Sequence, residues 1–362
     1  MHFYIHTLRV DDEIRIPPPL TIPLLRVSRE MRLPPVLTYS DDVLYNWAFD
    51  DDGDLRILTS FTFTDSESHF YLTSARIELI GVNALAVMQH SLDELFVGDS
   101  IAKKRITGFL TELAGVIGEM ESELNRMYGG CDVRVFYEEI RPWFQGESEE
   151  KRWVFEGIEL DPGLEYPNEL GGPSAGQSSL IHALDIFLGV HHHVTSSDDD
   201  DDTFLSRMQL YMPRHHRNFL SHLREQSTSR SLRAWVLEAA AADDTTQSLL
   251  NAYNAAVTAL KKFRDAHIVL VARYIIGPAA RVRANEGQSQ SVDGNRESQS
   301  DGSRENQSEV ESLSQSEGKE RNAESESNRE TETQALKGTG GTHLARFLKS
   351  VRDTTQGAVI QM

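Results

Sequence analysis

The chain has 362 residues, 39% hydrophobic and 8% aromatic, enough to bury the core of one large domain or two small ones. Its formal net charge of −20 argues against nucleic acid and anionic membranes as partners, because both bind basic surfaces. The single cysteine, Cys131, excludes an internal disulfide, a thiolate metal cluster and covalently attached c-type haem. No signal peptide is recognisable and no apolar run reaches the length of a membrane span, so we expect a soluble, cytoplasmic protein.

The first 35 residues are rich in proline, which interrupts regular secondary structure. We therefore predict that residues 1–35 form an extended N-terminal arm. A short helix should follow, with Ser40 as its N-cap and Tyr39 directly before it. The Asp- and Gly-rich residues 50–54 predict a loop.

Two long helices are predicted next. Residues 69–90 are apolar nearly all round, which indicates a buried helix that carries Phe70 and Ser74 one turn apart. Residues 91–128 predict a second, amphipathic helix that ends at Gly129. The simplest role of Ser74 is a hydrogen bond to the carbonyl one turn earlier.

The segment VFYEEIRPWFQG places Arg141 directly before a proline. A residue before proline is disfavoured in helical geometry, so we expect the helix to stop or kink at Arg141. Two interpretations are open for this side chain. It forms a surface salt bridge with Glu138, or its guanidinium holds a ligand carboxylate by two parallel hydrogen bonds.

Residues 171–190, GGPSAGQSSLIHALDIFLGV, combine a glycine-rich loop with a helix. Ser174 and Gln177 have the spacing of a capping box, and Gly189 should end the helix. The small residues of the loop leave a nearly bare backbone that a flat ligand can approach. No lysine follows the glycines, which excludes a phosphate-binding loop. Asp185 lies on or beside the apolar face, where a buried carboxylate needs a cationic partner.

Residues 251–276 predict a long helix, because they lack glycine and proline and carry apolar residues every three or four positions. His267 lies in the middle of this apolar stripe. Considered with this helix alone, a core histidine bonded to a carbonyl is the favoured interpretation. A metal on one ring nitrogen and an acceptor on the other would also satisfy the imidazole.

The composition changes after this helix. Residues 281–334 consist mainly of Ser, Gln, Glu, Asn and Arg, so they cannot bury enough apolar surface to fold and should be disordered. A glycine-rich loop and a short amphipathic helix follow within residues 335–362.

Together, these segments resemble the indoleamine 2,3-dioxygenase family of tryptophan-cleaving haem enzymes. The similarity is carried, in the family's order, by LPPVLTYSDDVLYNW, the helix with Phe70 and Ser74, VFYEEIRPW, GPSAGQSSLIHALDIFLGV, YMPRHHRNFL, the His267 helix and KGTGGTHLARFLKSVRDTT. SAGQSS, MPxxHR and the late GTGGT are specific in combination. The resemblance covers most of the chain from about residue 33, apart from the Ser- and Gln-rich insertion.

The resemblance implies an all-α fold in four parts. These are a residual N-terminal arm (1–35), a helical haem-binding domain (36–280), a disordered insertion (281–334), and a mobile glycine loop with a C-terminal helix (335–362). It also implies b-type haem with His267 as the iron ligand. Arg264 would face a haem propionate and pair with Asp185, and Ser174 would lie beside the cofactor.

The resemblance further implies a monomeric enzyme that inserts O₂ across the indole C2–C3 bond of L-tryptophan. The product would be N-formylkynurenine, the first intermediate of the kynurenine pathway, and an electron donor would keep the haem ferrous. Arg141 would hold the substrate carboxylate, Ser74 would lie near the oxygen, and Thr339 would close over the ammonium and carboxylate groups. The implied substrate pocket consists of Tyr39, Phe70, Ser74, Phe136, Tyr137, Arg141, Ser174, Ala175 and Thr339.

Family members usually carry a small N-terminal helical domain that covers the distal side of the haem. Only a short segment precedes LPPVL here, so we expect either a truncated product or an unusually open pocket. Two alternatives follow: a haem protein that binds O₂ without catalysis, and an inactive, haem-free relative. Arg141 and Thr339 favour the enzyme, because an oxygen carrier has no use for a carboxylate clamp.

Overall fold

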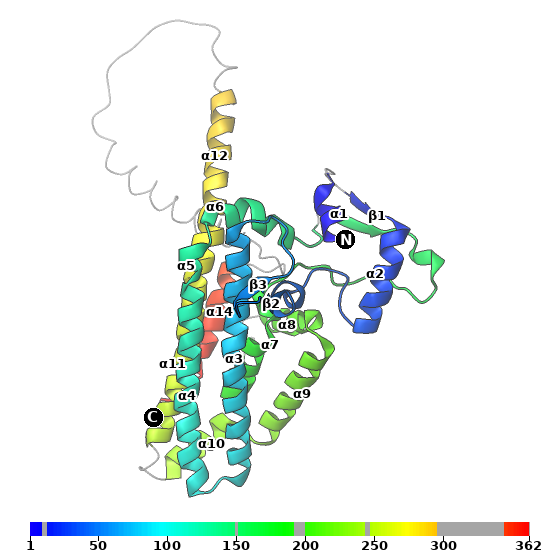
Figure 1. Cartoon of the computed structure of the whole chain (residues 1–362). Coiled ribbons are helices and arrows are strands. Elements are labelled where there is room, and N and C mark those ends of the chain that lie inside the picture. Colours follow the sequence, from blue (N-terminus) through cyan, green and yellow to red (C-terminus); the bar gives the residue numbers. More distant parts are fainter. Residues whose placement is uncertain (9–12, 149–150, 192–199, 243–246, 295–343, 362) are drawn as a thin grey trace, which may run out of the picture.

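The computed structural model describes residues 1–8, 13–148, 151–191, 200–242, 247–294 and 344–361. Helices dominate the fold, as predicted, and the described strands form only two short pairs. The long helices lie side by side in a bundle, and a smaller N-terminal unit projects from one end of it (Figure 1). Thr339 and most of the predicted insertion lie outside the described residues.

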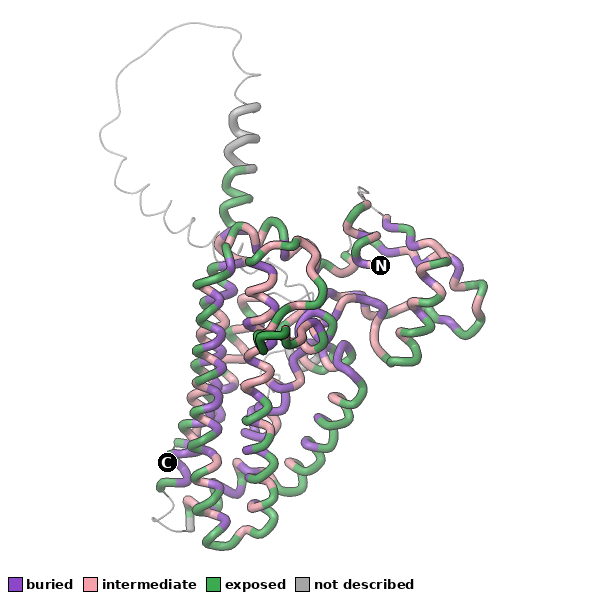
Figure 2. The backbone as a smooth tube through the Cα atoms, in the orientation of Figure 1, coloured by how far each residue is buried: buried purple, intermediate pink, exposed green. Residues whose placement is uncertain are grey.

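The bundle is built on two antiparallel helices, α3 (Asp65–Val97) and α4 (Ser100–Asn125), which lie next to α11 (Gln247–Val271). Gly98 joins α3 to α4 with a φ of 68°, a conformation that glycine adopts without strain. The amphipathic stripe predicted for α4 is confirmed, because its apolar residues are buried in the main core: Ile106, Leu110, Leu113, Ile117, Met120 and Leu124. Figure 2 shows buried segments along these helices.

The predicted boundary between the first two long helices is wrong. α3 begins at Asp65 and continues past Ser91 to Val97. The Ser91 hydroxyl donates to the carbonyl of Val87 at 2.8 Å, so it is satisfied inside the helix and does not cap a new one.

The His267 helix is longer than predicted. α11 continues through a π-helical turn, η8 (Ala272–Ile276), into α12 (Gly277–Gly294). The chain is therefore helical beyond residue 281, where we expected order to end. The predicted C-terminal helix is present as α14 (Leu344–Gly357) and packs against α11.

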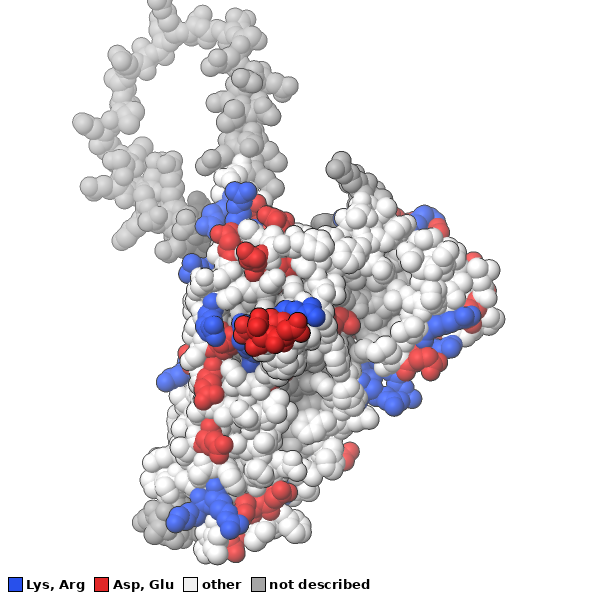
Figure 3. All heavy atoms as spheres, in the orientation of Figure 1, with Lys and Arg blue, Asp and Glu red and all other residues white. Residues whose placement is uncertain are grey.

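Shorter elements connect and cover the bundle. β2 (Trp47–Phe49) and β3 (Leu55–Ile57) form an antiparallel hairpin around the predicted acidic loop, and Figure 3 shows a compact acidic patch over it. The remaining elements are η1 (Ser40–Leu44), α5 (Met127–Gly130), α6 (Val133–Val135), η2 (Phe136–Ile140), η3 (Arg141–Phe144), η4 (Ile158–Leu160), η5 (Ala175–Gln177), α7 (Ser179–Leu188), α8 (Asp200–Met208), η6 (Gln209–Tyr211), α9 (Arg214–Ser229) and α10 (Leu232–Ala242).

The extended N-terminal arm is a wrong prediction. The segment folds into α1 (His2–Thr7), β1 (Glu13–Ile16) and α2 (Pro18–Met31), and β1 pairs in parallel with β4 (Arg152–Phe155). Prolines at the start of α2 are tolerated, because the first amides of a helix have no internal partner. Ile14 and Ile16 are fully buried in a second core that includes residues of β4 and α8.

The N-terminal unit also reaches the segment that carries Arg141. The His6 ring lies 4.9 Å from the Trp143 ring in η3, and Phe61 stacks on Trp143 at 4.8 Å. The residues before LPPVL therefore support the Arg141 turn.

By length and composition, α3 is the one described helix that could cross a membrane. Core helices of water-soluble proteins pass the same test, and α3 buries Tyr71, Ala84, Met88 and other side chains in the main core.

Candidate functional site

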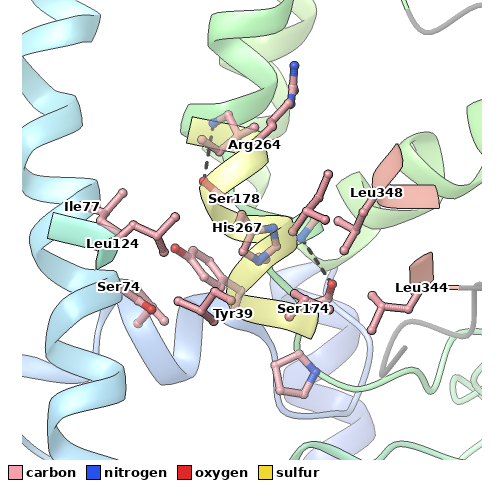
Figure 4. Close-up of a pocket in the computed structure, with 18 of the residues that line it drawn as sticks. Tyr39, Ser74, Ile77, Leu124, Ser174, Ser178, Arg264, His267, Leu344 and Leu348 are labelled. Atoms are coloured by element: carbon pink, nitrogen blue, oxygen red, sulfur yellow. Dashed lines mark hydrogen bonds between the residues drawn. The ribbon is translucent and has the colours of Figure 1, made fainter. Parts of the chain in front are cut away.

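A largely apolar cavity of about 290 Å³ lies inside the helical region, at the lower end of the volumes of small-molecule sites. α3 and η1 line one side, α11 another, and the SAGQSS loop and α14 complete the wall. Figure 4 shows His267 between Ser74 and Ile77 on one side and Leu344 and Leu348 on the other.

His267 lines this cavity, and no hydrogen bond joins its ring to the described residues. Burial, and secondarily the nearby Arg264, lower the pKa of His267 to about 4. The imidazole is therefore neutral at pH 7, with a nitrogen lone pair available to a ligand. A core histidine bonded to a carbonyl, the alternative favoured by the helix alone, is not what the structure shows.

This single imidazole fits a metal whose other ligands are supplied by a cofactor and not by the protein. Among the described residues, no group of three or more His, Cys, Asp or Glu side chains could hold a metal ion. Haem iron needs only one axial protein ligand, because the porphyrin supplies the other four nitrogens. One free imidazole on an apolar wall suits that requirement.

The ion pair expected between Arg264 and Asp185 is present beside the cavity. One guanidinium nitrogen of Arg264 lies 2.8 and 2.7 Å from the two carboxylate oxygens of Asp185, and another donates to the Thr355 hydroxyl. Arg264 and Asp185 are only 7% and 8% exposed. The pair joins α11 to α7, and Thr355 adds α14, so it fixes the helices around His267.

Arg141 lines the cavity, and no ion pair or hydrogen bond joins its side chain to the residues that the structure describes. Its Nε atom is buried without a hydrogen-bond partner, and the Tyr137 ring lies 5.5 Å from its guanidinium. Glu138, the partner in the surface salt-bridge interpretation, binds Arg134 at 3.0 Å instead. Burial lowers the pKa of Arg141 below its ordinary value. A half-buried guanidinium without a counter-charge provides a place for an anionic ligand group.

The helix stops at Arg141 as predicted, because the π-turn η2 ends at Ile140, although Arg141 itself keeps right-handed helical angles (φ −55°, ψ −36°). The chain changes here from the π-turn η2 to the 3₁₀ turn η3. Pro142 then occupies an early position of a new turn, where its missing N–H has no acceptor to lose.

Aromatic rings line the cavity near Arg141. The Phe70 and Phe136 ring centroids are 5.1 Å apart, and Phe144 lies 5.7 Å from Phe70. The structure thus brings Phe70 and Phe136 together, as predicted, and adds Phe144. Tyr137 does not line the cavity but lies against Arg141.

The small polar residues of the predicted pocket, Ser74 and Ser174, form hydrogen bonds with nearby backbone groups. Ser74 donates to the carbonyl of Phe70 at 3.2 Å, the hydrogen bond anticipated as its simplest role. Ser174 and Ala175 line the cavity, and the Ser174 hydroxyl accepts from the Gly176 amide at 3.2 Å. Ser74 therefore presents its side chain to the cavity without a free donor.

The capping box predicted for Ser174 and Gln177 is wrong. Ser174 caps only the short turn η5, whereas Ser178 caps α7. The buried Gln177 side chain donates to the Gly172 carbonyl and accepts from the Tyr39 amide, both at 2.9 Å. It therefore ties the loop to the Tyr39 segment and makes neither of these hydrogen bonds to Ser174.

Glu78 is a cavity residue that the sequence analysis missed. One of its carboxylate oxygens accepts from the Tyr39 hydroxyl at 2.9 Å and from the Ser178 hydroxyl at 2.6 Å. Burial raises the pKa of Glu78, although both hydrogen bonds oppose this shift. Its position four residues after Ser74, on the same helix face, is a signal that could have identified it. Asp42 and Thr73 also line the cavity unpredicted.

The fold and the cavity define a helical protein with one free imidazole for a flat, apolar cofactor and one free guanidinium for an anion. The sequence matches the indoleamine 2,3-dioxygenase family over residues 1–358, so the chain belongs to this family. Its members are haem-dependent dioxygenases.

Three relatives illustrate the similarity. Indoleamine 2,3-dioxygenase nanC of Aspergillus nanangensis is 29% identical over 86% of this chain and 66% of its own length. The 6-hydroxytryptophan 2,3-dioxygenase fscD of Fusarium equiseti is 31% identical over 73% of this chain and 63% of its own length. Indoleamine 2,3-dioxygenase 2 of Mus musculus is 32% identical over 95% of this chain and 73% of its own length. The matched region thus spans less than two-thirds of the two fungal relatives.

Proposed function

We propose that this protein is a haem-dependent dioxygenase that converts L-tryptophan to N-formylkynurenine. The observation that carries the proposal is the pairing of a neutral, unbonded imidazole and an unpaired guanidinium in one apolar cavity. Family membership supports the same reaction class.

In this proposal His267 holds the iron of b-type haem, and Arg264, kept in place by Asp185, lies near a propionate together with Ser174. When bound and ferrous, haem supplies the activation of O₂ that cleaves the indole C2–C3 bond. An external electron donor maintains the ferrous state.

The side chains of the opposite wall bind and orient the amino acid. Arg141 holds the carboxylate, and the rings of Phe70 and Phe136 pack on the indole and exclude water from the reacting carbons. Tyr39 and Ala175 complete the pocket. Tyr137 acts by stacking on Arg141. No protein base is assigned, since Ser74 already donates its proton to a carbonyl.

The free guanidinium distinguishes this enzyme from an oxygen carrier, because a buried, unpaired cation costs stability and a carrier gains nothing from it. The name of the Fusarium equiseti relative shows that hydroxylated tryptophans belong among the substrates to test.

The test begins with haem reconstitution of the purified chain, followed by desalting. We expect a stable Soret band in the wild type and in His222→Ala, a control in which the exposed imidazole of α9 is removed. His267→Ala should lose haem. Arg141→Ala should keep haem but lose most formation of N-formylkynurenine from tryptophan under reducing, aerobic conditions. Equal haem loss in the His267 and Arg141 variants, or no Soret band in the wild type, would overturn the assignment.

A further inference from the structure

Asp42 is a buried acid in the cavity wall that the proposed reaction does not use. It lies in the π-turn η1, three residues after Tyr39 and one before Val43, and all three line the cavity. Asp42 is only 5% exposed. None of the hydrogen bonds or ion pairs among the described residues involves its carboxyl group.

The nearby acids Asp41 and Glu67 differ from Asp42, because both accept hydrogen bonds. Asp41 accepts from the Thr38 amide at 2.9 Å and from the Thr38 hydroxyl at 2.7 Å. Glu67 accepts from Ser60 and, at 2.7–2.8 Å, from the Phe61 and Thr62 amides and the Thr62 hydroxyl. Asp42 therefore differs from acids that only stabilise a turn, and its hydrogen-bonding capacity is left for a ligand.

Burial, reinforced by the charges of Asp41 and Glu67, raises the pKa of Asp42 well above its ordinary value. Burial therefore disfavours the charged form of this side chain. Either form can pair with a hydroxyl group, because a carboxylate accepts from it and a carboxylic acid both donates and accepts.

Asp42 and Arg141 serve different parts of the cavity. Asp42 lines the cavity from η1 and Arg141 from η3, and no hydrogen bond or ion pair joins the two side chains in the described part of the chain. Aromatic rings connect them, because Phe144, three residues after Arg141, packs on Phe70 and also lies 6.2 Å from Tyr71. Tyr71 in turn lies close enough to Asp42 for the acid to raise its pKa.

A ligand held by its carboxylate at Arg141 would occupy the same cavity that Asp42 lines, beside the rings of Phe70 and Phe144. We propose that Asp42 determines substrate specificity by hydrogen-bonding a hydroxyl group on the benzene part of the indole, so that the site prefers a hydroxylated tryptophan to tryptophan itself. This inference rests on the proposed function. The reason is that an apolar ring edge would leave the buried acid unpaired, whereas a ring hydroxyl satisfies it.

Binding measured by isothermal titration calorimetry tests the inference without turnover. L-Tryptophan, 5-hydroxy-L-tryptophan and 6-hydroxy-L-tryptophan are titrated into the haem-loaded protein. We expect at least one hydroxylated ligand to bind about 10- to 100-fold more tightly than tryptophan, the range of discrimination set by one buried polar group.

Two substitutions at Asp42 and one beside it separate the explanations. Asp42→Leu should abolish or reverse the preference, and Asp42→Asn, which keeps a donor and an acceptor at similar volume, should retain part of it. Asp41→Asn, whose parent residue is bonded to Thr38 outside the cavity, should leave the preference unchanged. Thermal unfolding should show that Asp42→Leu is folded, because it removes an unpaired buried acid.

The outcomes are distinct. Equal preference in the wild type and Asp42→Leu would overturn the inference, and so would a loss of affinity for all three ligands in that variant, which would indicate contact with the indole N–H instead. If none of the ligands binds the wild type, the proposed function itself fails, and the role of Asp42 fails with it.

Discussion

The Asp185–Arg264 pair allows a quantitative test of how the helices around the site are held together. Asp185→Asn keeps the side-chain volume but removes the charge opposite Arg264. The Arg264 side chain, which taken alone is 8% exposed, would then remain buried with Thr355 and a neutral amide as partners. Removing one member of a buried ion pair costs about 3–5 kcal/mol, because the remaining charge stays uncompensated.

Solvent screening is weak here, since the Asp185 side chain is also only 11% exposed. We therefore expect the full cost of about 3–5 kcal/mol, which lowers the melting temperature by roughly 6–20 °C. The assay is thermal unfolding of the haem-free protein, followed by far-UV circular dichroism.

The matched control is Asp265→Asn on the same helix as Arg264. Asp265 pairs with Lys261, but its side chain is 37% exposed, so its removal should cost less than about 1 kcal/mol. The double variant Asp185→Leu with Arg264→Leu should recover most of the loss, because apolar residues replace both charges. If Asp185→Asn costs no more than the control, the pair is not the structural link described above.

Three further predictions concern the core, the cavity and pH. Leu113→Ala, at a fully buried position of α4, should lower the free energy of unfolding in urea by about 2–5 kcal/mol, against less than about 0.5 kcal/mol for the exposed Val82→Ala. Glu78→Leu should leave the Tyr39 and Ser178 hydroxyls without their acceptor and weaken tryptophan binding, measured by calorimetry, about tenfold. Glu78→Gln should bind tryptophan nearly as the wild type does. Equal losses of affinity in the two variants would refute this role of Glu78. Acidification from pH 7 to 4 should destabilise the haem-free protein, because His267 has a pKa of about 4 when folded and 6.5 when unfolded, so the unfolded chain takes up a proton first. His267→Leu should reduce this loss in a urea series at both pH values, and an unchanged pH dependence would contradict the assignment.

Features that depend on a local pattern could be predicted from the sequence. The apolar stripe of α4 faces the core because its spacing matches the helical repeat, and the same pattern on α11 placed His267 on the inner face. Phe70 and Phe136 reach the cavity as the family resemblance implied.

Features that depend on distant partners could not. The N-terminal residues were expected to form an isolated arm, but Ile14 and Ile16 are buried against a strand far along the sequence, and prolines occupy the first turn of helix α2. Likewise, Asp42 and Glu78 lie about one helical turn after the predicted site residues Tyr39 and Ser74, but the sequence analysis selected neither of them. A local pattern could not show that Tyr39 and Ser178 satisfy Glu78, while none of the described side chains satisfies Asp42.

The parallel pairing of β1 with β4 has a consequence for synthesis of the chain. Glu13 aligns with Arg152 and Ile16 with Phe155, so β1 leaves the ribosome long before its partner exists. At translation rates of about 5–20 residues per second, the delay is roughly 7–28 s. During this interval Ile14 and Ile16 lack the strand that buries them in the folded protein, so the N-terminal segment stays exposed in the nascent chain until β4 has been made.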